Sequence, residues 1–244
     1  STIWYIYFVL FTILPHRRIF FGKCYQQPNF ILSKPPWNMS YLVLVRHGLS
    51  DYNKQGLWTG WDNPPMSAAG LAQARKTGRE LSDIKFDYAY SSDQIRSVQT
   101  LEEIFKATDQ NVSIIQDQAI RERNYGIYTR KNKWEVQKEL GDEEFRKLRR
   151  GWDYPIPAGE SLRQVYERVI PYFRNVIEAK LREDKNVIIA SSGNAIRALV
   201  KYLENISNEQ ISELEIGTGE AYVYTIDSNG KVVSKQILGE NPMK

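Results

Sequence analysis

The fold class is decided by one stretch of sequence, Tyr41-Leu42-Val43-Leu44-Val45-Arg46-His47-Gly48. Its five apolar residues predict a short buried strand, which opens into a loop at the Arg-His-Gly end. A second apolar run, residues 187–190, opens in the same way into Ser191-Ser192-Gly193-Asn194. Ligands of open α/β sheets bind beyond the carboxyl ends of the strands. The two loops, far apart in the sequence, are therefore expected to share one pocket.

Strand and helix patterns alternate along the rest of the chain. Helical spacing of apolar residues predicts helices over residues 67–81, 95–105, 131–150, 160–182 and 196–203. Short apolar or alternating runs predict strands over residues 41–45, 86–90, 112–115, 187–190, 221–226 and 231–238, the last two joined by a turn at 227–230. This order predicts an α/β fold, a three-layer α/β/α sandwich with a mostly parallel sheet.

Composition excludes several classes of protein. The chain has 244 residues, of which 42% are hydrophobic and 25% charged, so it is neither a disordered chain nor a polytopic membrane protein. One cysteine, Cys24, allows no internal disulfide, and two histidines, His16 and His47, offer no zinc-binding spacing. The net charge of +4 lies in residues 1–38, which leaves 29 basic against 29 acidic residues beyond them. No basic face for nucleic acid is expected.

Residues 1–38 differ from the body of the chain, residues 39–244. Twelve residues from Ile3 to Leu14 are apolar apart from one threonine, which is short of the roughly 18–20 residues that span a bilayer. The basic residues follow this run, whereas in a signal peptide they precede it. We interpret the segment as a non-native or disordered extension, with Met39 as the natural start of a cytoplasmic protein. An interfacial membrane anchor and a packed arm are the alternatives.

The loop after the first strand resembles the signature of a known family. The sequence from Leu44 to Asn53, followed by Trp58-Thr59-Gly60-Trp61, resembles the histidine phosphatase superfamily and, within it, the cofactor-dependent phosphoglycerate mutases. The resemblance runs from residue 41 to about 226. It implies that His47 carries a phosphoryl group while 3-phosphoglycerate and 2-phosphoglycerate interconvert, a reaction of glycolysis and gluconeogenesis. It also implies priming by 2,3-bisphosphoglycerate and no metal.

The resemblance assigns roles to further residues. Glu122 matches the family's proton-transfer carboxylate, and Arg96, one turn into a helix, can point back at an anion over the preceding strand. The catalytic set implied in this way is His47, Glu122, Arg46, Arg96 and the position of Ser192. The substrate-binding set is Arg46, Ser50, Asn53, Thr59, Gly60, Arg96, Glu122, Tyr125, Lys133, Arg149, Arg150, Gly193 and Asn194.

Ser192 departs from the family, which has its second catalytic histidine at this position. Serine can form a hydrogen bond but supplies no positive charge, and losing a preorganised donor typically costs ~10²–10³ in rate. Three interpretations of Ser192 are open. It is an introduced change made to trap a ligand or a phosphohistidine, a natural change in a protein that binds phosphoglycerates without turnover, or a natural change that leaves slow activity. The otherwise intact motif favours the first interpretation.

Two other functions fit parts of the sequence. A phosphatase of the same superfamily would share His47 and Glu122 but would have less need of Lys133, Arg149 and Arg150. A non-catalytic phosphoglycerate-binding protein would keep the whole binding set. The expected partners are small-molecule phosphoglycerates and further copies of the chain, in a homodimer or homotetramer. Neither nucleic acid nor a membrane is expected as a partner.

Overall fold

The computed structural model describes residues 38–239. The interpretations of the N-terminal segment as an extension, an anchor or a packed arm therefore fall outside the described residues, except at Asn38. Within the described range, strands and helices alternate in the order that the sequence predicts. No helix in this range combines the length and the apolar character needed to cross a membrane.

A six-stranded sheet with the order β3-β2-β4-β1-β5-β6 forms the centre of the fold. Its strands are β1 (Met39–Arg46), β2 (Tyr88–Ser91), β3 (Ile114–Gln116), β4 (Val187–Ser191), β5 (Ala221–Asp227) and β6 (Val232–Leu238). Neighbours pair in parallel from β3 to β1, whereas β5 is antiparallel to both β1 and β6. A tight turn can join only antiparallel neighbours, which accounts for the β5–β6 edge. The expected mostly parallel sheet is confirmed.

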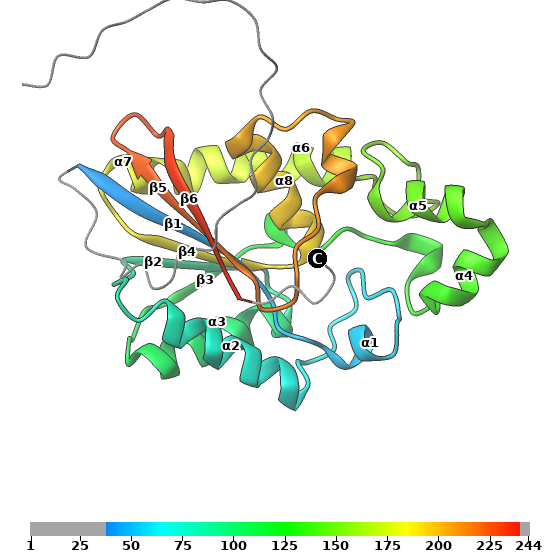
Figure 1. Ribbon diagram of the computed structural model, residues 1–244, viewed down its shortest axis with the longest axis horizontal. Helices are drawn as coiled ribbons and strands as arrows, with labels where there is room; N and C mark the ends of the chain where they lie inside the picture. The colour runs from blue at the N-terminus through cyan, green and yellow to red at the C-terminus, as the bar shows by residue number, and fades with distance from the viewer. Residues whose placement is uncertain (1–37, 240–244) are drawn as a thin grey trace, which may run out of the picture. The chain divides into compact units, whose positions relative to one another are not determined.

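Helices cover both faces of the sheet (Figure 1). Helices α2 (Ala68–Glu80) and α3 (Ile95–Thr108) lie on one face, and α6 (Leu162–Tyr172) and α8 (Gly193–Glu204) lie on the other. Side chains alternate along β1, so Leu42 and Leu44 pack into the core under α6 and α8. The intervening Val43 and Val45 pack into the core under α2 and α3. The predicted three-layer sandwich is confirmed.

Two expected helices differ from the structure. The range 131–150 contains two helices, α4 (Lys133–Leu140) and α5 (Asp142–Arg150), because Gly141 between them takes a φ of 78°, which glycine adopts without strain. The range 160–182 holds α6, a π-helical turn at Phe173–Ile177 and α7 (Glu178–Arg182). Pro171, inside α6, has no N–H for the helical hydrogen bonds, and the π-helical turn begins two residues after it.

Short elements connect the layers. They are α1 (Asp51–Lys54) and the 3₁₀ turns η1 (Gln118–Ile120), η2 (Gly126–Tyr128) and η4 (Gln210–Glu213). In Figure 1 the α4–α5 pair and α1 lie beyond one end of the sheet. This is the end at which β1 and β4 open into their loops.

The loop after β1 is held against the start of α2 by a close backbone contact. A Cβ atom added at Gly48 would lie 2.2 Å from the carbonyl oxygen of Gly70, and one added at Gly70 would lie 2.2 Å from that of Leu49, so both positions require glycine. Ser67 caps α2 by accepting a hydrogen bond from the Gly70 N–H at 3.2 Å, and its hydroxyl donates to the Leu49 carbonyl at 2.8 Å. These contacts fix the backbone that carries His47.

Candidate active site

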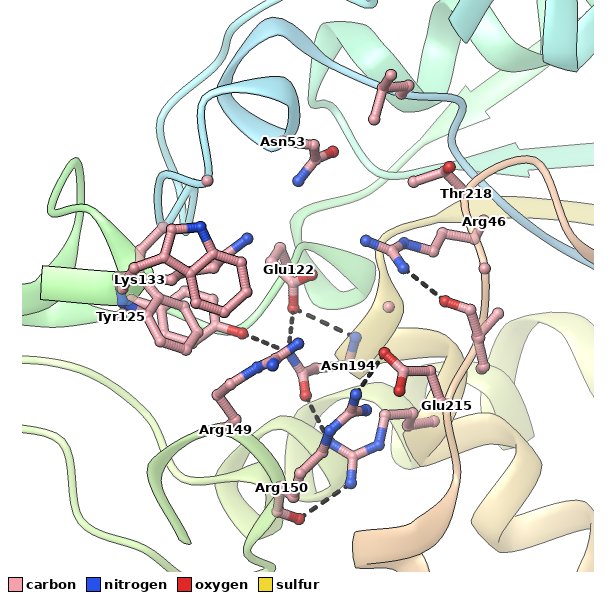
Figure 2. Close-up of a pocket in the computed structure, with 18 residues that line it drawn as sticks. Arg46, Asn53, Glu122, Tyr125, Lys133, Arg149, Arg150, Asn194, Glu215 and Thr218 are labelled. Atoms are coloured by element: carbon pink, nitrogen blue, oxygen red, sulfur yellow. Dashed lines mark hydrogen bonds and ion pairs between the residues drawn. The ribbon is translucent and has the colours of Figure 1, made fainter. Parts of the chain in front are cut away.

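A cavity of about 290 Å³ lies at the carboxyl ends of β1 and β4, with a narrower recess of about 60 Å³ that His47 lines. Figure 2 shows side chains from several elements pointing into this space. The two spaces bring together twelve of the predicted site residues: Arg46, His47, Asn53, Thr59, Arg96, Glu122, Tyr125, Lys133, Arg149, Arg150, Gly193 and Asn194. The expected convergence of the two strand-end loops is confirmed.

His47 is buried and held in one tautomer. Its Nδ1 lies 2.7 Å from the carbonyl oxygen of Gly48, and because a carbonyl can only accept, Nδ1 carries the proton. Burial, followed by the charges of Arg96 and Arg46, holds the pKa of the His47 imidazole well below its usual value. The ring is therefore neutral at physiological pH, with the lone pair of Nε2 available as a nucleophile.

Arg46 and Arg96 bring two positive charges to the recess, and neither forms an ion pair with a carboxylate in the described part of the chain. Arg96 donates from Nη1 to the carbonyl oxygen of Asp62 at 2.9 Å and from Nη2 to that of Gly60 at 3.2 Å. Arg46 donates from Nη1 to the carbonyl oxygen of Ile216. The Nε atoms of both arginines are buried and have no hydrogen-bond partner among residues 38–239. Carbonyl partners hold the two side chains in place without cancelling their charge, so an anion bound here would be stabilised.

The carboxylate of Glu122 lies at the N-terminus of α8. Its Oε1 accepts hydrogen bonds from the backbone N–H of Arg123 at 2.6 Å, from Asn194 Nδ2 at 2.8 Å and from the Asn194 N–H at 3.3 Å. Asn194 Nδ2 also contacts the hydroxyl of Tyr125 at 2.9 Å, and Arg197 Nη1 donates to Asn194 Oδ1 at 2.9 Å. These contacts fix the orientation of the Glu122 carboxyl group beside the start of α8.

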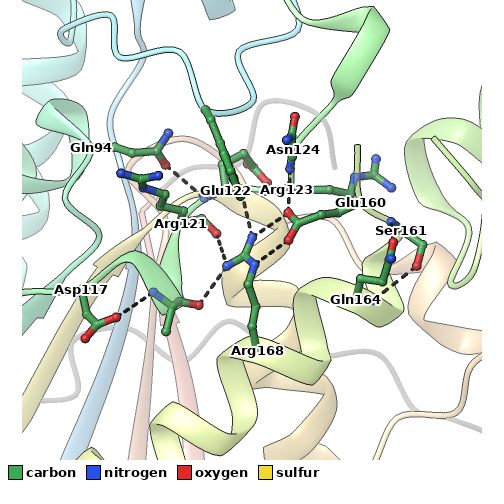
Figure 3. A network of polar contacts seen from close by, with 12 residues as sticks. Gln94, Asp117, Arg121, Glu122, Arg123, Asn124, Glu160, Ser161, Gln164 and Arg168 are labelled. Atoms are coloured by element: carbon green, nitrogen blue, oxygen red, sulfur yellow. Dashed lines mark hydrogen bonds and ion pairs between the residues drawn. The ribbon is translucent and has the colours of Figure 1, made fainter. Parts of the chain in front are cut away.

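A partly buried arginine on α6, Arg168, holds the loop that carries Glu122 (Figure 3). Arg168 Nη1 donates to the carbonyl oxygens of Ala119 at 2.8 Å and Arg121 at 3.0 Å, and Nη2 donates to that of Glu122 at 2.9 Å. The same guanidinium forms a two-pronged ion pair with Glu160, with Nε–Oε1 2.8 Å and Nη2–Oε2 2.9 Å. Every N–H of the planar Arg168 guanidinium has a carbonyl or carboxylate partner, and these contacts fix the loop relative to α6.

Lys133 and Arg149 supply positive charge to the wider part of the cavity. Burial, then the charges of Arg149 and Arg46, lower the pKa of Lys133 to about 8. Its Nζ lies 5.6 Å from the centroid of the Trp58 ring. Neither Lys133 nor Arg149 has a carboxylate partner in the described part of the chain. Both remain available to a ligand.

Three predicted residues do not line the cavity or the recess. Ser50 caps α1 and holds Asn53, from whose backbone N–H its hydroxyl oxygen accepts a hydrogen bond at 3.2 Å. Gly60 contributes its carbonyl oxygen to Arg96 at 3.2 Å. Ser192 is fully buried at the N-cap of α8, and its hydroxyl has no hydrogen-bond partner within the described range. Ser50 and Gly60 thus position other site residues.

Several residues that line the cavity were not predicted from the sequence: Leu49, Gly56, Trp58, Trp134, Arg197, Glu215, Ile216, Gly217 and Thr218. Arg197 could have been found, because it lies three residues after Asn194 and a helix places such pairs on one face. The stretch from Glu215 to Thr218 precedes β5, which runs antiparallel to β1. Its residues therefore lie at the same edge of the sheet as the carboxyl end of β1. No cluster of three or more potential metal ligands occurs in the described range.

Comparisons with known proteins agree with this geometry. The family model for the histidine phosphatase superfamily (branch 1) matches residues 42–237. The 2,3-bisphosphoglycerate-dependent phosphoglycerate mutase of Parvibaculum lavamentivorans is 39% identical over 202 residues, which cover 82% of this chain and 96% of that protein. The mutase of the same name from Nitrobacter winogradskyi is 40% identical over 197 residues, 80% of this chain and 95% of its own length.

Solved structures show the same fold. A mycobacterial glucosyl-3-phosphoglycerate phosphatase in complex with VO3 superposes with a TM-score of 0.71 at 20% identity, covering 83% of this chain and 99% of that one. A phosphoglycerate mutase from Bacillus anthracis superposes with a TM-score of 0.65 at 22% identity, covering 83% of this chain and 93% of that one. Mutases and phosphatases thus share this arrangement of sheet and helices.

Proposed function

The chain belongs to branch 1 of the histidine phosphatase superfamily and, within it, to the 2,3-bisphosphoglycerate-dependent phosphoglycerate mutases, and from this membership we propose that it interconverts 3-phosphoglycerate and 2-phosphoglycerate. The observation that carries the proposal is the state of His47. Burial and the charges of Arg96 and Arg46 hold its pKa well below the usual value, its Nδ1 is fixed by the Gly48 carbonyl, and neither guanidinium forms an ion pair with a carboxylate among residues 38–239. These are the requirements of a nitrogen nucleophile that attacks a phosphate ester.

The proposed reaction begins with 2,3-bisphosphoglycerate as the primer. Nε2 of His47 attacks phosphorus, the N–P bond forms as the P–O ester bond breaks, and the leaving oxygen takes a proton from Glu122. Phosphohistidine then passes its phosphoryl group to the free hydroxyl of a monophosphoglycerate, and that hydroxyl returns its proton to Glu122. Because three N–H groups converge on Oε1 of Glu122, we assign the proton exchange to Oε2.

Binding of the phosphoglycerate is proposed to use two groups of cations. Arg46 and Arg96 would hold the transferring phosphoryl group in the recess, and Lys133, Arg149 and Arg150 would hold the remaining anionic group in the wider cavity. A guanidinium matches the oxygens of carboxylate and phosphate in a planar, two-pronged manner. A phosphatase acting on a simple phosphate ester would need the first group but not the second.

Ser192 is proposed to limit the rate of this reaction. Its hydroxyl is buried, has no hydrogen-bond partner among residues 38–239 and is not part of the cavity wall, so it gives the transferring group no charged donor. We expect the variant Ser192→His, primed with 2,3-bisphosphoglycerate, to convert 3-phosphoglycerate to 2-phosphoglycerate at least ~10²-fold faster than the present chain.

The experiment measures both proteins side by side, with inorganic phosphate release recorded in the same samples. His47→Ala in the Ser192→His background is the control and should abolish both transfer and release. If the Ser192→His protein releases phosphate but forms no 2-phosphoglycerate, it is a phosphatase and the mutase proposal is wrong. If it binds 3-phosphoglycerate without either reaction, a binding role replaces both enzymes.

A further inference from the structure

The cavity contains a carboxylate that the binding of an anion does not explain. Five cationic side chains line it, those of Arg46, Lys133, Arg149, Arg150 and Arg197. Two acidic side chains also line it, those of Glu122 and Glu215. Oε1 of Glu122 already accepts hydrogen bonds from three N–H groups. Glu215 precedes β5 and lies beside Arg150, the last residue of α5 (Figure 2). A negative charge here opposes a ligand that is itself negative.

Glu215 is paired with Arg150. Oε1 of Glu215 forms an ion pair with Nη2 of Arg150, and the two side chains are 26% and 20% exposed. The backbone around Arg150 is also fixed, because its carbonyl oxygen accepts a hydrogen bond from Arg197 Nη2 at 3.0 Å. The pair is thus formed before any ligand enters, and a ligand carboxylate must compete with Glu215 for Arg150.

Arg149, the neighbour of Arg150, has a different environment. It lies 5.6 Å from the centroid of the Phe145 ring and has no carboxylate partner in residues 38–239. Of the two adjacent arginines, Arg150 therefore forms the ion pair with Glu215, whereas the Glu215 charge reaches Arg149 only at longer range. A ligand that places a hydroxyl group beside Glu215 gains a hydrogen bond there, whereas a ligand that places a carboxylate there meets a like charge.

From this asymmetry we propose that Glu215 is a specificity-determining residue, which holds Arg150 in an ion pair and weakens the binding of carboxylate-bearing ligands relative to hydroxyl-bearing ones. The inference rests on the proposed function, since it takes a phosphoglycerate as the anionic ligand. It adds a residue that tunes which three-carbon phosphates the site accepts. Removal of the Glu215 charge frees Arg150 for the ligand carboxylate.

The test compares two ligands that differ at one end only. 3-Phosphoglycerate and glycerol 3-phosphate share a phosphate on a three-carbon chain, which ends in a carboxylate in the first and a hydroxymethyl group in the second. Calorimetry at pH 7 on the full chain should show Glu215→Gln binding 3-phosphoglycerate roughly five- to fiftyfold more tightly, the range for one partly screened charge. Its affinity for glycerol 3-phosphate should change by less than about twofold.

Two further variants separate the possible causes. Glu213→Gln removes an exposed carboxylate two residues away that does not line the cavity, and it should change neither affinity. In an Arg150→Met background, the gain from Glu215→Gln should shrink, because there is no longer an arginine to release. A gain of full size in that background would mean that Glu215 acts by repulsion alone, and the ion-pair inference would be overturned.

The remaining outcomes distinguish this inference from the proposed function. If the parent chain binds 3-phosphoglycerate and Glu215→Gln leaves the affinity unchanged or lowers it, only the role of Glu215 is disproved. Equal gains for both ligands also disprove it, because the effect would not depend on the carboxylate. If neither the parent chain nor Glu215→Gln binds 3-phosphoglycerate while both melt cooperatively, the proposed function fails and the inference fails with it.

Discussion

Lys133 is a cation of the cavity whose charge changes near physiological pH, since its pKa is lowered to about 8 by burial and by the charges of Arg149 and Arg46. A bound anion favours the charged amine and raises this pKa in the complex. The affinity that Lys133 contributes is therefore fully present below pH 8 and is lost as the pH rises above it. Between pH 8 and the pKa of Lys133 in the complex, the affinity falls by at most about tenfold per pH unit.

This pH dependence can be measured as the dissociation constant of 3-phosphoglycerate between pH 6.5 and 9.5. The phosphate of the ligand is already doubly charged over most of this range, since its second pKa is about 6. Lys133→Arg is the matched control, because arginine stays charged throughout and its affinity should be flat above pH 8. An equal decline in both proteins would assign the titration to another group.

At the scale of elements, Arg168 on α6 connects a helix to the loop that carries the Glu122 carboxylate. Arg168→Met removes five hydrogen bonds to that loop and to Glu160 and leaves the mostly buried Glu160 without its counter-ion. We expect a loss of about 2–4 kcal/mol in the free energy of unfolding. Because a shift of about 1 Å in a catalytic group can cost 10²-fold, we expect kcat to fall by about that factor, with a smaller change in KM.

The measurement pairs denaturant unfolding with mutase kinetics in the Ser192→His background. Arg163→Met on the same helix is the control, since Arg163 and its partner Asp153 are about half exposed and such pairs contribute little. The double variant Arg168→Met/Glu160→Gln should recover part of the stability, because no unpaired carboxylate remains. A folded Arg168→Met protein with an unchanged kcat would show that the clamp does not position Glu122.

The order of elements was predictable because each strand and helix has a hydrophobic period of its own. Leu42 to Val45 are apolar on both sides of the strand, as a central strand covered by two helical layers requires. The helix predicted over residues 131–150 was wrong at Gly141, where apolar spacing continues across a glycine in the left-handed region. Periodicity detects which face is buried but does not detect a change in chain direction.

The candidate site was predictable where its residues belong to contiguous motifs. His47, Glu122 and Asn194 each lie in a short segment that resembles the family, and all three line the cavity or its recess. The contacts of Arg168 with Glu160 and of Arg150 with Glu215 were missed. Each joins segments that no local pattern connects, so only the packing of the whole sheet brings them together.

At the scale of the whole molecule, the cavity has an excess of positive charge, which acidic side chains elsewhere in the chain balance. Residues 39–244 hold equal numbers of basic and acidic side chains, yet five cations and two carboxylates line the cavity. These cations come from β1, α4, α5 and α8, so the fold holds like charges near one another when no anion is present. An anion that contacts several of these cations should bind the folded state and stabilise it against unfolding.

We therefore expect 2,3-bisphosphoglycerate, at about 100 times its dissociation constant, to stabilise the chain by about 2.7 kcal/mol, which corresponds to a rise in Tm of about 5–10 °C. Salt should reduce the rise, because it screens the attraction. Differential scanning fluorimetry at fixed ligand concentration, in low and high NaCl, measures both effects. Arg149→Met should reduce the rise, whereas Lys147→Met, on the same helix but exposed and paired with Glu143 and Glu144, should leave it unchanged. An equal reduction in the two variants would mean that the ligand responds to the general charge of α5 and not to the cavity.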